Sequence, residues 1–224
     1  MFSQVLILAA GKGERLLPLT YEIPKAMIKV HNKELIAFSL DQIKKTTLNI
    51  SATIGENSDL LINYFVKNNV RNIVNTAGHG NSWWIFNSLM RYVDEPILVL
   101  PCDIITKINF DWLMDQYKNA NCPPCMLVPV VPINGIEGDF IFESLGQVLK
   151  LSRTVESPHY CSGIQILNPK KINDLIFEEE DFQKVWLSLI AENKLFCSAN
   201  YQENWFTINT ISQLNHYNLK TTLV

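Results

Sequence analysis

The sequence predicts an α/β protein built on a mixed, mostly parallel sheet with helices on both faces. Short apolar runs alternate with helix-length amphipathic segments through the first half of the 224 residues, as in parallel strands joined by crossover helices. Hydrophobic residues make up 47% of the chain and charged residues 18%, which supplies a core and excludes a disordered chain. The chain contains no repeat, low-complexity tract or Gly/Ser-rich linker, so we expect a single domain over residues 1–224.

The elements of the first half follow from hydrophobic periodicity and length. The expected strands cover residues 4–10, 49–54, 70–75 and 96–101. The expected helices cover residues 34–46, 59–67, 82–92 and 111–119. A long loop that contains Gly11, Gly13, Pro18 and Pro24 separates the first strand from the first helix.

The second half changes character. Four strand-like runs follow one another with short turns, which predicts antiparallel or mixed additions, and they cover residues 126–131, 138–144, 147–152 and 160–167. Helices are then expected over residues 169–177, 181–193 and 211–220. The acidic run Glu178–Asp181 suits a helix start, where the dipole favours negative charge, better than a metal site.

The charge and hydropathy of the sequence exclude some classes of binding partner. The formal net charge is −3, which argues against a large nucleic-acid-binding face. Residues 1–50 hold 7 Lys and Arg against 4 Asp and Glu, whereas residues 51–224 hold 12 against 18, so a small anionic ligand suits the first segment. No apolar run approaches the roughly 18 residues that span a bilayer, and the start of the chain lacks a secretion signal. We expect a cytoplasmic protein that binds neither nucleic acid nor membrane.

Five cysteines are expected to stay reduced in such a protein. Cys122 and Cys125 form a C-P-P-C pair, but a zinc site needs a second pair and the other three cysteines stand apart. We interpret the pair as a loop that leads into the strand CMLVPVV.

The segment LAAGKGERLLPLTYEIPKAM, residues 8–27, is the most informative. After the first strand it offers little side-chain bulk, so its backbone N–H groups can cradle phosphate oxygens. Arg15 can grip phosphate oxygens bidentately, and Lys25, held by Pro24, supplies a compact charge at the far end of the loop.

These twenty residues resemble the signature L-A-A-G-x-G-x-R-L-x-P-L-T-x-x-x-P-K-x-L/M of the sugar-1-phosphate nucleotidyltransferases, the enzymes that make NDP-sugars. The resemblance implies a Rossmann-like fold, an NTP and a small phosphorylated acceptor as substrates, and Mg²⁺ as cofactor. It further implies that Arg15, Lys25 and Asp103 are the catalytic residues. The residues that it assigns to the nucleotide in this segment are Leu8, Ala9, Ala10, Gly11, Lys12 and Gly13.

Asp103 follows the buried run PILVLP, at the strand end where open α/β sheets bind ligands. Its carboxylate suits Mg²⁺, and the alternative is an Asp that caps a turn. The family commonly has Gly before this Asp, and Cys102 replaces it. The resemblance implies that Asp103 is a metal ligand.

The family commonly closes with Trp-x-Asp-x-Gly-Thr, whose Asp is a second Mg²⁺ ligand. In WFTINTISQL, Trp205 and Thr210 match, whereas Thr207 stands at the Asp position and Asn209 at the Gly position. Asn209 could supply a neutral carbonyl oxygen to the metal, and the alternative is a loss of catalytic power.

In NTAGHGNSWWIFNSL the family has a Gly-Thr-Ala motif that touches base and sugar, and the resemblance assigns Gly80 and Asn81 to the nucleotide. Asn81 has two interpretations, a hydrogen bond to a base edge or a cap on the following helix. Trp83 is expected to line the acceptor pocket, and one of the two adjacent tryptophans is expected in the core. The resemblance also points to Gly138 and Gly163 on the acceptor side, although the usual Glu-Lys-Pro is absent.

The function predicted is a Mg²⁺-dependent nucleotidyltransferase that joins an NTP to a phosphorylated acceptor, most simply a sugar 1-phosphate, and releases pyrophosphate. One alternative is a cytidylyltransferase for phosphocholine or a similar non-sugar phosphate, which the altered Thr207 and Asn209 and the Trp83–Trp84 pair favour. Another is a non-catalytic regulator that binds nucleotide sugars. The apolar surface of the second half could support a homodimer.

Overall fold

The computed structural model describes residues 2–46, 48–133 and 137–220. These residues group into two compact units, each made of segments that are not contiguous in sequence. We call residues 5–78, 100–108 and 204–220 the N-terminal unit, and residues 2–4, 79–99 and 109–203 the central unit. Strand β6 (Ile97–Pro101) begins in the central unit, and its last two residues belong to the N-terminal unit.

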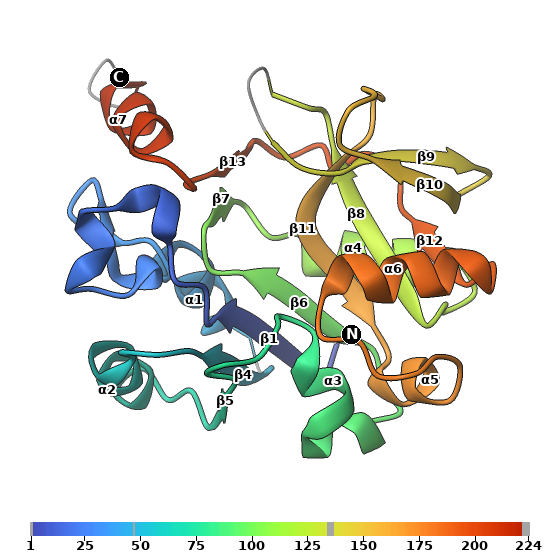
Figure 1. Ribbon diagram of the computed structural model, residues 1–224, viewed down its shortest axis with the longest axis horizontal. Helices are drawn as coiled ribbons and strands as arrows, with labels where there is room; N and C mark the ends of the chain where they lie inside the picture. Colours follow the sequence, from blue (N-terminus) through green and yellow to red (C-terminus); the bar gives the residue numbers. More distant parts are fainter. Residues whose placement is uncertain (1, 47, 134–136, 221–224) are drawn as a thin grey trace. The chain divides into compact units, whose positions relative to one another are not determined.

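The N-terminal unit is built on strands in the order β5-β4-β1 (Figure 1). β1 (Gln4–Ala9) carries the fully buried run Val5, Leu6 and Ile7. β4 (Asn49–Ile54) and β5 (Asn72–Asn75) pair in parallel, and α2 (Asp59–Lys67) connects them. This is the predicted strand–helix–strand crossover, and α2 buries Leu61 and Phe65, one helical turn apart.

The loop after β1 contains three single-turn 3₁₀ helices, η1 (Glu14–Leu16), η2 (Leu19–Tyr21) and η3 (Lys25–Met27). A short hairpin follows, in which β2 (Lys29–Val30) pairs antiparallel with β3 (Lys33–Glu34). His31 and Asn32 at its tip have φ of 47° and 61°, which matches a two-residue turn of the primed type. The predicted helix over residues 34–46 is therefore shorter, since the hairpin takes Glu34 and α1 covers Ala37–Ile43.

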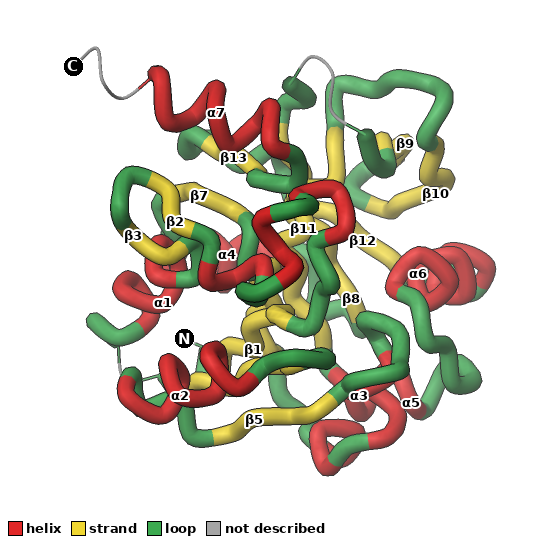
Figure 2. The backbone as a smooth tube through the Cα atoms, turned by 60° about the vertical axis from the view of Figure 1, so that its left-hand side comes forward, coloured by secondary structure: helices red, strands yellow, loops and turns green. Residues whose placement is uncertain are grey.

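The sequence pattern did not predict a second antiparallel pair in this unit. β7 (Ile104–Thr106) pairs with β13 (Trp205–Thr207), so that Ile104 faces Thr207 across the ladder. The chain then enters α7 (Ile211–Lys220), which packs against β2 (Figure 2).

A cluster of buried apolar side chains joins these pieces, and we call it the loop cluster. Its members come from both ends of the loop after β1, from the hairpin, and from β7, β13 and α7: Leu16, Ile28, Val30, Leu35, Ile105, Ile208 and Leu214. The cluster thus packs the signature segment against two stretches that lie more than 75 residues away in sequence.

The central unit holds strands in the order β6-β11-β8-β12-β10-β9. β11 (Tyr160–Leu167) is antiparallel to both β6 and β8 (Cys125–Val130). β12 (Leu195–Cys197) runs parallel to β8 and antiparallel to β10 (Gln147–Ser152), which closes a hairpin with β9 (Phe140–Ser144). The predicted mixed sheet, with antiparallel additions in the second half, is confirmed.

The helices of the central unit are α3 (Trp83–Asn87), η4 (Leu89–Tyr92), α4 (Phe110–Asn119), α5 (Pro169–Asn173) and α6 (Phe182–Ala191). A continuous helix over residues 82–92 is wrong. Ser88 has an extended backbone, and its hydroxyl accepts a hydrogen bond from the N–H of Met90, so it ends α3 and caps η4. The acidic run ends as a helix start, as predicted, because the Asp181 side chain caps α6.

The C-P-P-C segment is the predicted loop into β8, and all five cysteines are free. The buried hydroxyl of Tyr117 donates a hydrogen bond to the carbonyl of Pro123 at 2.8 Å, which fixes this loop. Burial raises the pKa of the Cys125 thiol, so it stays protonated.

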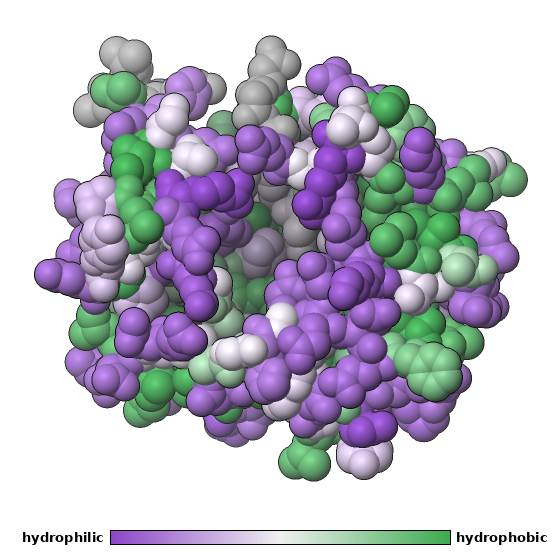
Figure 3. Space-filling view, in the orientation of Figure 1, coloured by the Kyte–Doolittle hydropathy of each residue, from purple (hydrophilic) through white to green (hydrophobic). Residues whose placement is uncertain are grey.

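The surface of the central unit shows apolar side chains over α6 and the β9–β10 hairpin (Figure 3). Leu149 and Leu187 are about half exposed there. Among the helices of residues 2–46, 48–133 and 137–220, none is long and apolar enough to cross a membrane.

The loop cluster predicts a large cost for truncating Ile208, which is 1% exposed. We expect Ile208→Ala to lower the free energy of unfolding by about 2–5 kcal/mol, because it leaves a cavity between β13, β7 and the signature loop. Urea unfolding measures the change. Phe177→Ala is the control, since Phe177 is 94% exposed and we expect its truncation to change stability by less than about 0.5 kcal/mol. Equal effects of the two substitutions would contradict the packing described.

Buried thiols predict a loss of stability in alkali. Burial raises the pKa of Cys102 and of Cys197 to about 12. The folded state therefore keeps protons that the unfolded chain loses above pH 9, and stability falls as the pH rises from about 9 to 12, by up to ~1.4 kcal/mol per pH unit for each thiol. Unfolding in urea at several pH values measures the slope. Cys197→Ala should reduce the slope by the share of one thiol, and an unchanged slope would contradict this origin.

Candidate functional site

The signature loop begins where β1 ends. The N–H of Ala9 donates to the hydroxyl of Thr53 at 3.2 Å, and the carbonyl of Leu8 accepts from the N–H of Cys102 at 3.0 Å. Gly55 lets the chain pass closely, since a Cβ there would lie 2.4 Å from the carbonyl oxygen of Ala10. These contacts fix the strand from which the predicted nucleotide-binding loop starts.

Gly13 is the residue of the loop that has to be glycine. Its φ is +68°, and a Cβ there would lie 2.8 Å from the Thr20 methyl and 3.1 Å from the Lys25 Cβ. Its carbonyl accepts hydrogen bonds from the Thr20 hydroxyl at 2.9 Å and the Leu16 N–H at 2.8 Å. Gly13 therefore packs directly on the stem of Lys25. Gly11 is different, because a Cβ there would meet no atom within 4 Å.

Lys25 lies at the start of η3, directly after Pro24. The backbone around it is held by hydrogen bonds from Met27 N–H to Pro24 O at 2.8 Å and from Ile36 N–H to Ala26 O at 3.0 Å. The Lys25 side chain is 12% exposed and its ammonium pairs with Asp103, whose side chain is 16% exposed. The same ammonium donates a hydrogen bond to Asn209 Oδ1 at 2.5 Å.

The β7–β13 pair explains how Asp103 and Asn209 meet. Asp103 precedes β7, and Asn209 follows β13. The antiparallel register extends past both strands, because the N–H of Ile208 donates to the carbonyl of Asp103 at 2.9 Å. Two residues more than 100 positions apart are thereby placed on one lysine.

The side-chain amide of Asn209 has a defined orientation. A lysine ammonium only donates hydrogen bonds, so the atom that faces Lys25 has to be the carbonyl oxygen. The amide nitrogen turns the other way and donates to the hydroxyl of Thr207 at 2.7 Å. Thr207, which stands where the family carries an Asp, thus orients Asn209.

A capping box fixes the backbone of Asn209. The Thr210 hydroxyl accepts from the N–H of Gln213 at 3.2 Å, and Gln213 Oε1 accepts from the N–H of Thr210 at 3.1 Å and of Asn209 at 2.7 Å. We did not predict Gln213 from the sequence, although the spacing T-x-x-Q before a helix is a readable signal for it.

The oxygens of Asp103 and Asn209 fit a magnesium ion. Both bind one ammonium, so they converge on one position, and carboxylate and amide oxygens are ligands that Mg²⁺ accepts. Mg²⁺ commonly takes few protein ligands and completes its shell with water and substrate phosphates. Over the described part of the chain, no group of three or more His, Cys, Asp and Glu side chains could hold a metal by itself.

Cys102 beside Asp103 is not a ligand of this kind. Its thiol is buried, and burial together with the Asp103 charge raises its pKa to about 12, so the sulfur stays neutral. Replacement of the family's Gly by Cys therefore adds apolar packing.

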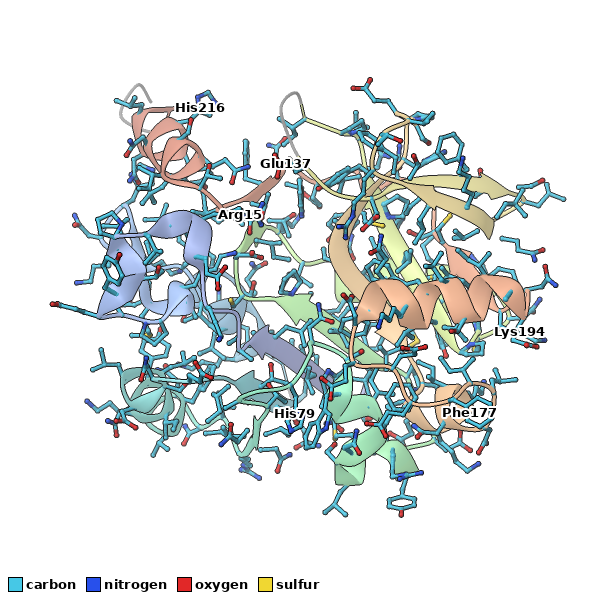
Figure 4. The ribbon with its side chains drawn as sticks, viewed as in Figure 1. Arg15, His79, Glu137, Phe177, Lys194 and His216 are labelled. Atoms are coloured by element: carbon cyan, nitrogen blue, oxygen red, sulfur yellow. The ribbon has the colours of Figure 1, made fainter. Side chains whose placement is uncertain are left out.

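Arg15 and Lys12 lie on the exposed side of the loop. Arg15 is part of η1 (Figure 4). Lys12 forms an exposed ion pair with Glu56 at 3.5 Å. Of the predicted catalytic residues, Lys25 and Asp103 are in contact, and the predicted metal ligand Asn209 joins them.

The remaining predicted residues belong to the central unit. The N–H of Gly80 donates to Glu180 Oε2 at 2.9 Å, and a Cβ on Gly80 would lie 1.9 Å from the Glu180 carbonyl oxygen. Asn81 Oδ1 accepts a hydrogen bond from the N–H of Phe182 at 2.9 Å, so Asn81 caps the start of α6. The interpretation of Asn81 as a cap of α3, the helix that follows it in sequence, is therefore wrong. Gly80 and Asn81 are thus tied to the start of α6.

His79 and Trp83 extend this contact. Their rings stack with centroids 4.4 Å apart, and His79 Nδ1 lies 3.1 Å from Glu180 Oε1. The hydrogen bond from Gly80 and the neighbouring imidazole lower the pKa of Glu180. Trp84 is fully buried, which confirms that one of the two tryptophans belongs to the core.

The surroundings of Gly138 and the backbone angle of Gly163 explain why both residues are glycines. A Cβ on Gly138 would lie 2.1 Å from the Tyr160 hydroxyl oxygen. Gly163 has φ of +84° and lies at an irregularity of the β11–β8 ladder.

Asp139, next to Gly138, forms a bidentate ion pair with Arg153, at 3.1 and 3.3 Å, and accepts a hydrogen bond from Gln183. The sequence pattern gave no sign of this pair.

The sequence is similar to known proteins over a region that includes the signature loop. A sequence model of the family described as "Nucleotidyl transferase" matches residues 4–134, more than half of the chain. The chain is 22% identical over 218 residues to a mannose-1-phosphate guanyltransferase of Debaryomyces hansenii, covering 91% of this chain and 60% of that protein. It is 41% identical over 63 residues to a CTP:phosphoglutamine cytidylyltransferase of Campylobacter jejuni, covering 28% of this chain and 25% of that protein. The chain thus spans less than two thirds of the length of these relatives.

The solved structure of an inositol-1-phosphate CTP transferase from T. maritima is similar in fold, with a TM-score of 0.75 at 16% identity over 99% of this chain and 96% of that one. This likeness confirms the predicted Rossmann-like α/β fold. Together with the matched signature region, it confirms the resemblance drawn from residues 8–27. The chain belongs to the nucleotidyl transferase family.

Proposed function

We propose that this protein is a Mg²⁺-dependent nucleotidyltransferase that joins an NTP to a sugar 1-phosphate. The observation that carries the proposal is the contact of Lys25, at the end of the signature loop, with both Asp103 and Asn209. A loop of phosphate-binding type, a lysine, a carboxylate and an oriented amide oxygen converge there. A protein that only binds nucleotide sugars would not need all of these groups in one place.

The reaction joins two phosphates. An oxygen of the acceptor phosphate attacks the α-phosphorus of the NTP, a new P–O bond forms, and the bond from the α-phosphorus to the β-bridging oxygen breaks, so that pyrophosphate leaves. Such a transfer requires alignment and neutralisation of charge more than covalent chemistry from the protein.

Side chains and backbone groups of this chain would supply both the alignment and the neutralisation of charge. Backbone N–H groups from Gly11 to Gly13 would hold phosphate oxygens of the NTP, and the Arg15 guanidinium would neutralise charge on the leaving β- and γ-phosphates. Lys25, whose backbone is fixed, would direct the acceptor phosphate against the α-phosphate. In the central unit, Gly80 and Asn81 are proposed to line the nucleotide, and Gly138, Gly163 and Trp83 the acceptor.

Asp103 and Asn209 would hold the magnesium ion. When bound, Mg²⁺ neutralises phosphate charge in the transition state. The Asn209 amide carries no charge, so we expect the metal site to depend strongly on phosphates that the substrates bring.

A cytidylyltransferase for a non-sugar phosphate is the second candidate. It is favoured by the 41% identity over 63 residues to a CTP:phosphoglutamine cytidylyltransferase. The ring stack of the exposed His79 and the half-buried Trp83 supports it too, because an aromatic face suits a cationic or planar acceptor such as phosphocholine.

Release of pyrophosphate tests these candidates together. We expect activity with one NTP or dTTP and one acceptor from a panel of sugar 1-phosphates, phosphocholine and a phosphorylated amide, in the presence of Mg²⁺ and not in excess EDTA. Release that requires a sugar 1-phosphate supports the first candidate, and release that requires phosphocholine or the amide supports the second. Silence across the panel, together with a nucleotide that raises the Tm, would favour a regulator that binds without turnover.

Asp103→Asn tests the role of the carboxylate. We expect turnover to fall by at least ~100-fold, because the substitution removes the negative charge shared by Lys25 and the proposed metal. The Tm should also fall, because the mostly buried Lys25 ammonium loses its charged partner, so turnover is compared at a temperature at which the variant is folded. Asp59→Asn, an exposed change at the start of α2 in the same unit, is the control and should retain activity. Near-normal turnover of Asp103→Asn would sink the assignment.

A further inference from the structure

The Lys25 ammonium lies where the two proposed metal ligands converge. It pairs with Asp103 and donates to Asn209 Oδ1 at 2.5 Å. All three groups are largely shielded from solvent or half-buried, so their charges interact more strongly than they would in bulk water. The Lys25 ammonium therefore occupies the position between the Asp103 and Asn209 oxygens where a metal cation would bind.

A divalent cation would be drawn to the same two oxygens. An ammonium and a divalent ion repel each other at contact distance, and one carboxylate cannot neutralise both. The two cations are thus alternative partners of Asp103 and Asn209 unless a further anion arrives between them.

We propose that Lys25 is a counter-cation that competes with the metal for Asp103 and Asn209, and that a substrate phosphate lets the metal bind by drawing Lys25 away. The inference rests on the proposed function, in which Lys25 binds phosphate. It makes metal and phosphate binding cooperative. By reciprocity, each raises the affinity of the other by the same factor.

The loop permits this exchange without rearranging its backbone. Hydrogen bonds to Pro24 and Ala26 hold the chain on both sides of Lys25, and Gly13 packs against the base of its side chain. The outer carbons of the side chain are free to rotate, since a lysine stem is flexible. Only the ammonium has to move from the oxygens to a phosphate.

Asn209 keeps its place during the exchange. Thr207 accepts from its amide nitrogen, so the carbonyl oxygen faces the cation position whichever cation is there. Thr207 is accordingly a positioning residue. Outer-shell partners of this kind change metal affinity by 10–100-fold in other metal sites, and we expect the lower end of about tenfold for a single hydrogen bond.

The test is Mn²⁺ binding to the full chain, with free Mn²⁺ counted by electron paramagnetic resonance. We expect Lys25→Gln, which keeps a hydrogen-bond donor and loses the charge, to bind Mn²⁺ at least about fivefold more tightly than the wild-type protein in the absence of nucleotide. Its turnover should fall by at least ~100-fold. Lys29→Gln removes the same charge from an exposed position four residues later, and its Mn²⁺ affinity should be unchanged.

Inorganic pyrophosphate serves as the phosphate probe. We expect it to tighten Mn²⁺ binding to the wild-type protein more than to Lys25→Gln, after correction for the complex that Mn²⁺ forms with pyrophosphate alone. Thr207→Val should weaken Mn²⁺ binding about tenfold, and Thr207→Ser, which keeps the hydroxyl, should restore it.

Equal or weaker Mn²⁺ binding by a folded Lys25→Gln protein would overturn the competition, even if the wild-type protein is active. Lys25→Met, which keeps the stem and has no donor, repeats the measurement if Lys25→Gln does not fold. Failure of the proposed function looks different, because the wild-type protein would then release no pyrophosphate while the order of Mn²⁺ affinities stayed as expected.

Discussion

The packing of the loop cluster is the constraint on which the rest of the site depends. Leu16 lies within the signature segment and Ile28 directly follows it. Ile105 lies two residues after Asp103, and Ile208 directly precedes Asn209. Burial of these side chains in one cluster holds three chain segments that are remote in sequence at the same place. The charged site is therefore held by apolar packing, and Lys25, Asp103 and Asn209 need only short side-chain adjustments to meet. A cavity in the cluster would loosen all three at once.

The charge balance of the site explains why Thr207, and not a second carboxylate, can stand at the position where the family commonly has an Asp. One lysine and one aspartate, both mostly buried, neutralise each other, and Asn209 adds an acceptor without adding charge. A second carboxylate in the same space would leave an excess negative charge, which is costly away from water. Thr207 uses the vacated family position for a hydrogen bond that orients the amide.

Local patterns in the sequence predicted much of the fold, and long-range pairing explains most of what they missed. Strands 49–54, 147–152 and 160–167 and helices 59–67 and 211–220 have the expected ends, because period and turn residues act within a few positions. Lys25 was predicted from the signature motif, and Asp103 from its place at the end of a buried strand. β7 and β13 are three residues each and carry no period of their own, so their pairing across a hundred residues could not be predicted. The same holds for Asn81, whose partner Phe182 is 101 residues away, and for Thr207, whose role is set by Asn209.

The capping box links the integrity of one helix to the site. Gln213 lies in the first turn of α7, and its side chain holds the N–H groups of Asn209 and Thr210. Helix ends open locally far more often than a protein unfolds as a whole. Each opening of the first turn of α7 would release the backbone of Asn209 and with it one of the two oxygens. The free energy of that local opening, which hydrogen exchange of the α7 amides reports, is thus also the free energy that keeps Asn209 in place beside Lys25 and Asp103. Moderate heat would open this turn and release Asn209 while the remainder of the fold stays intact.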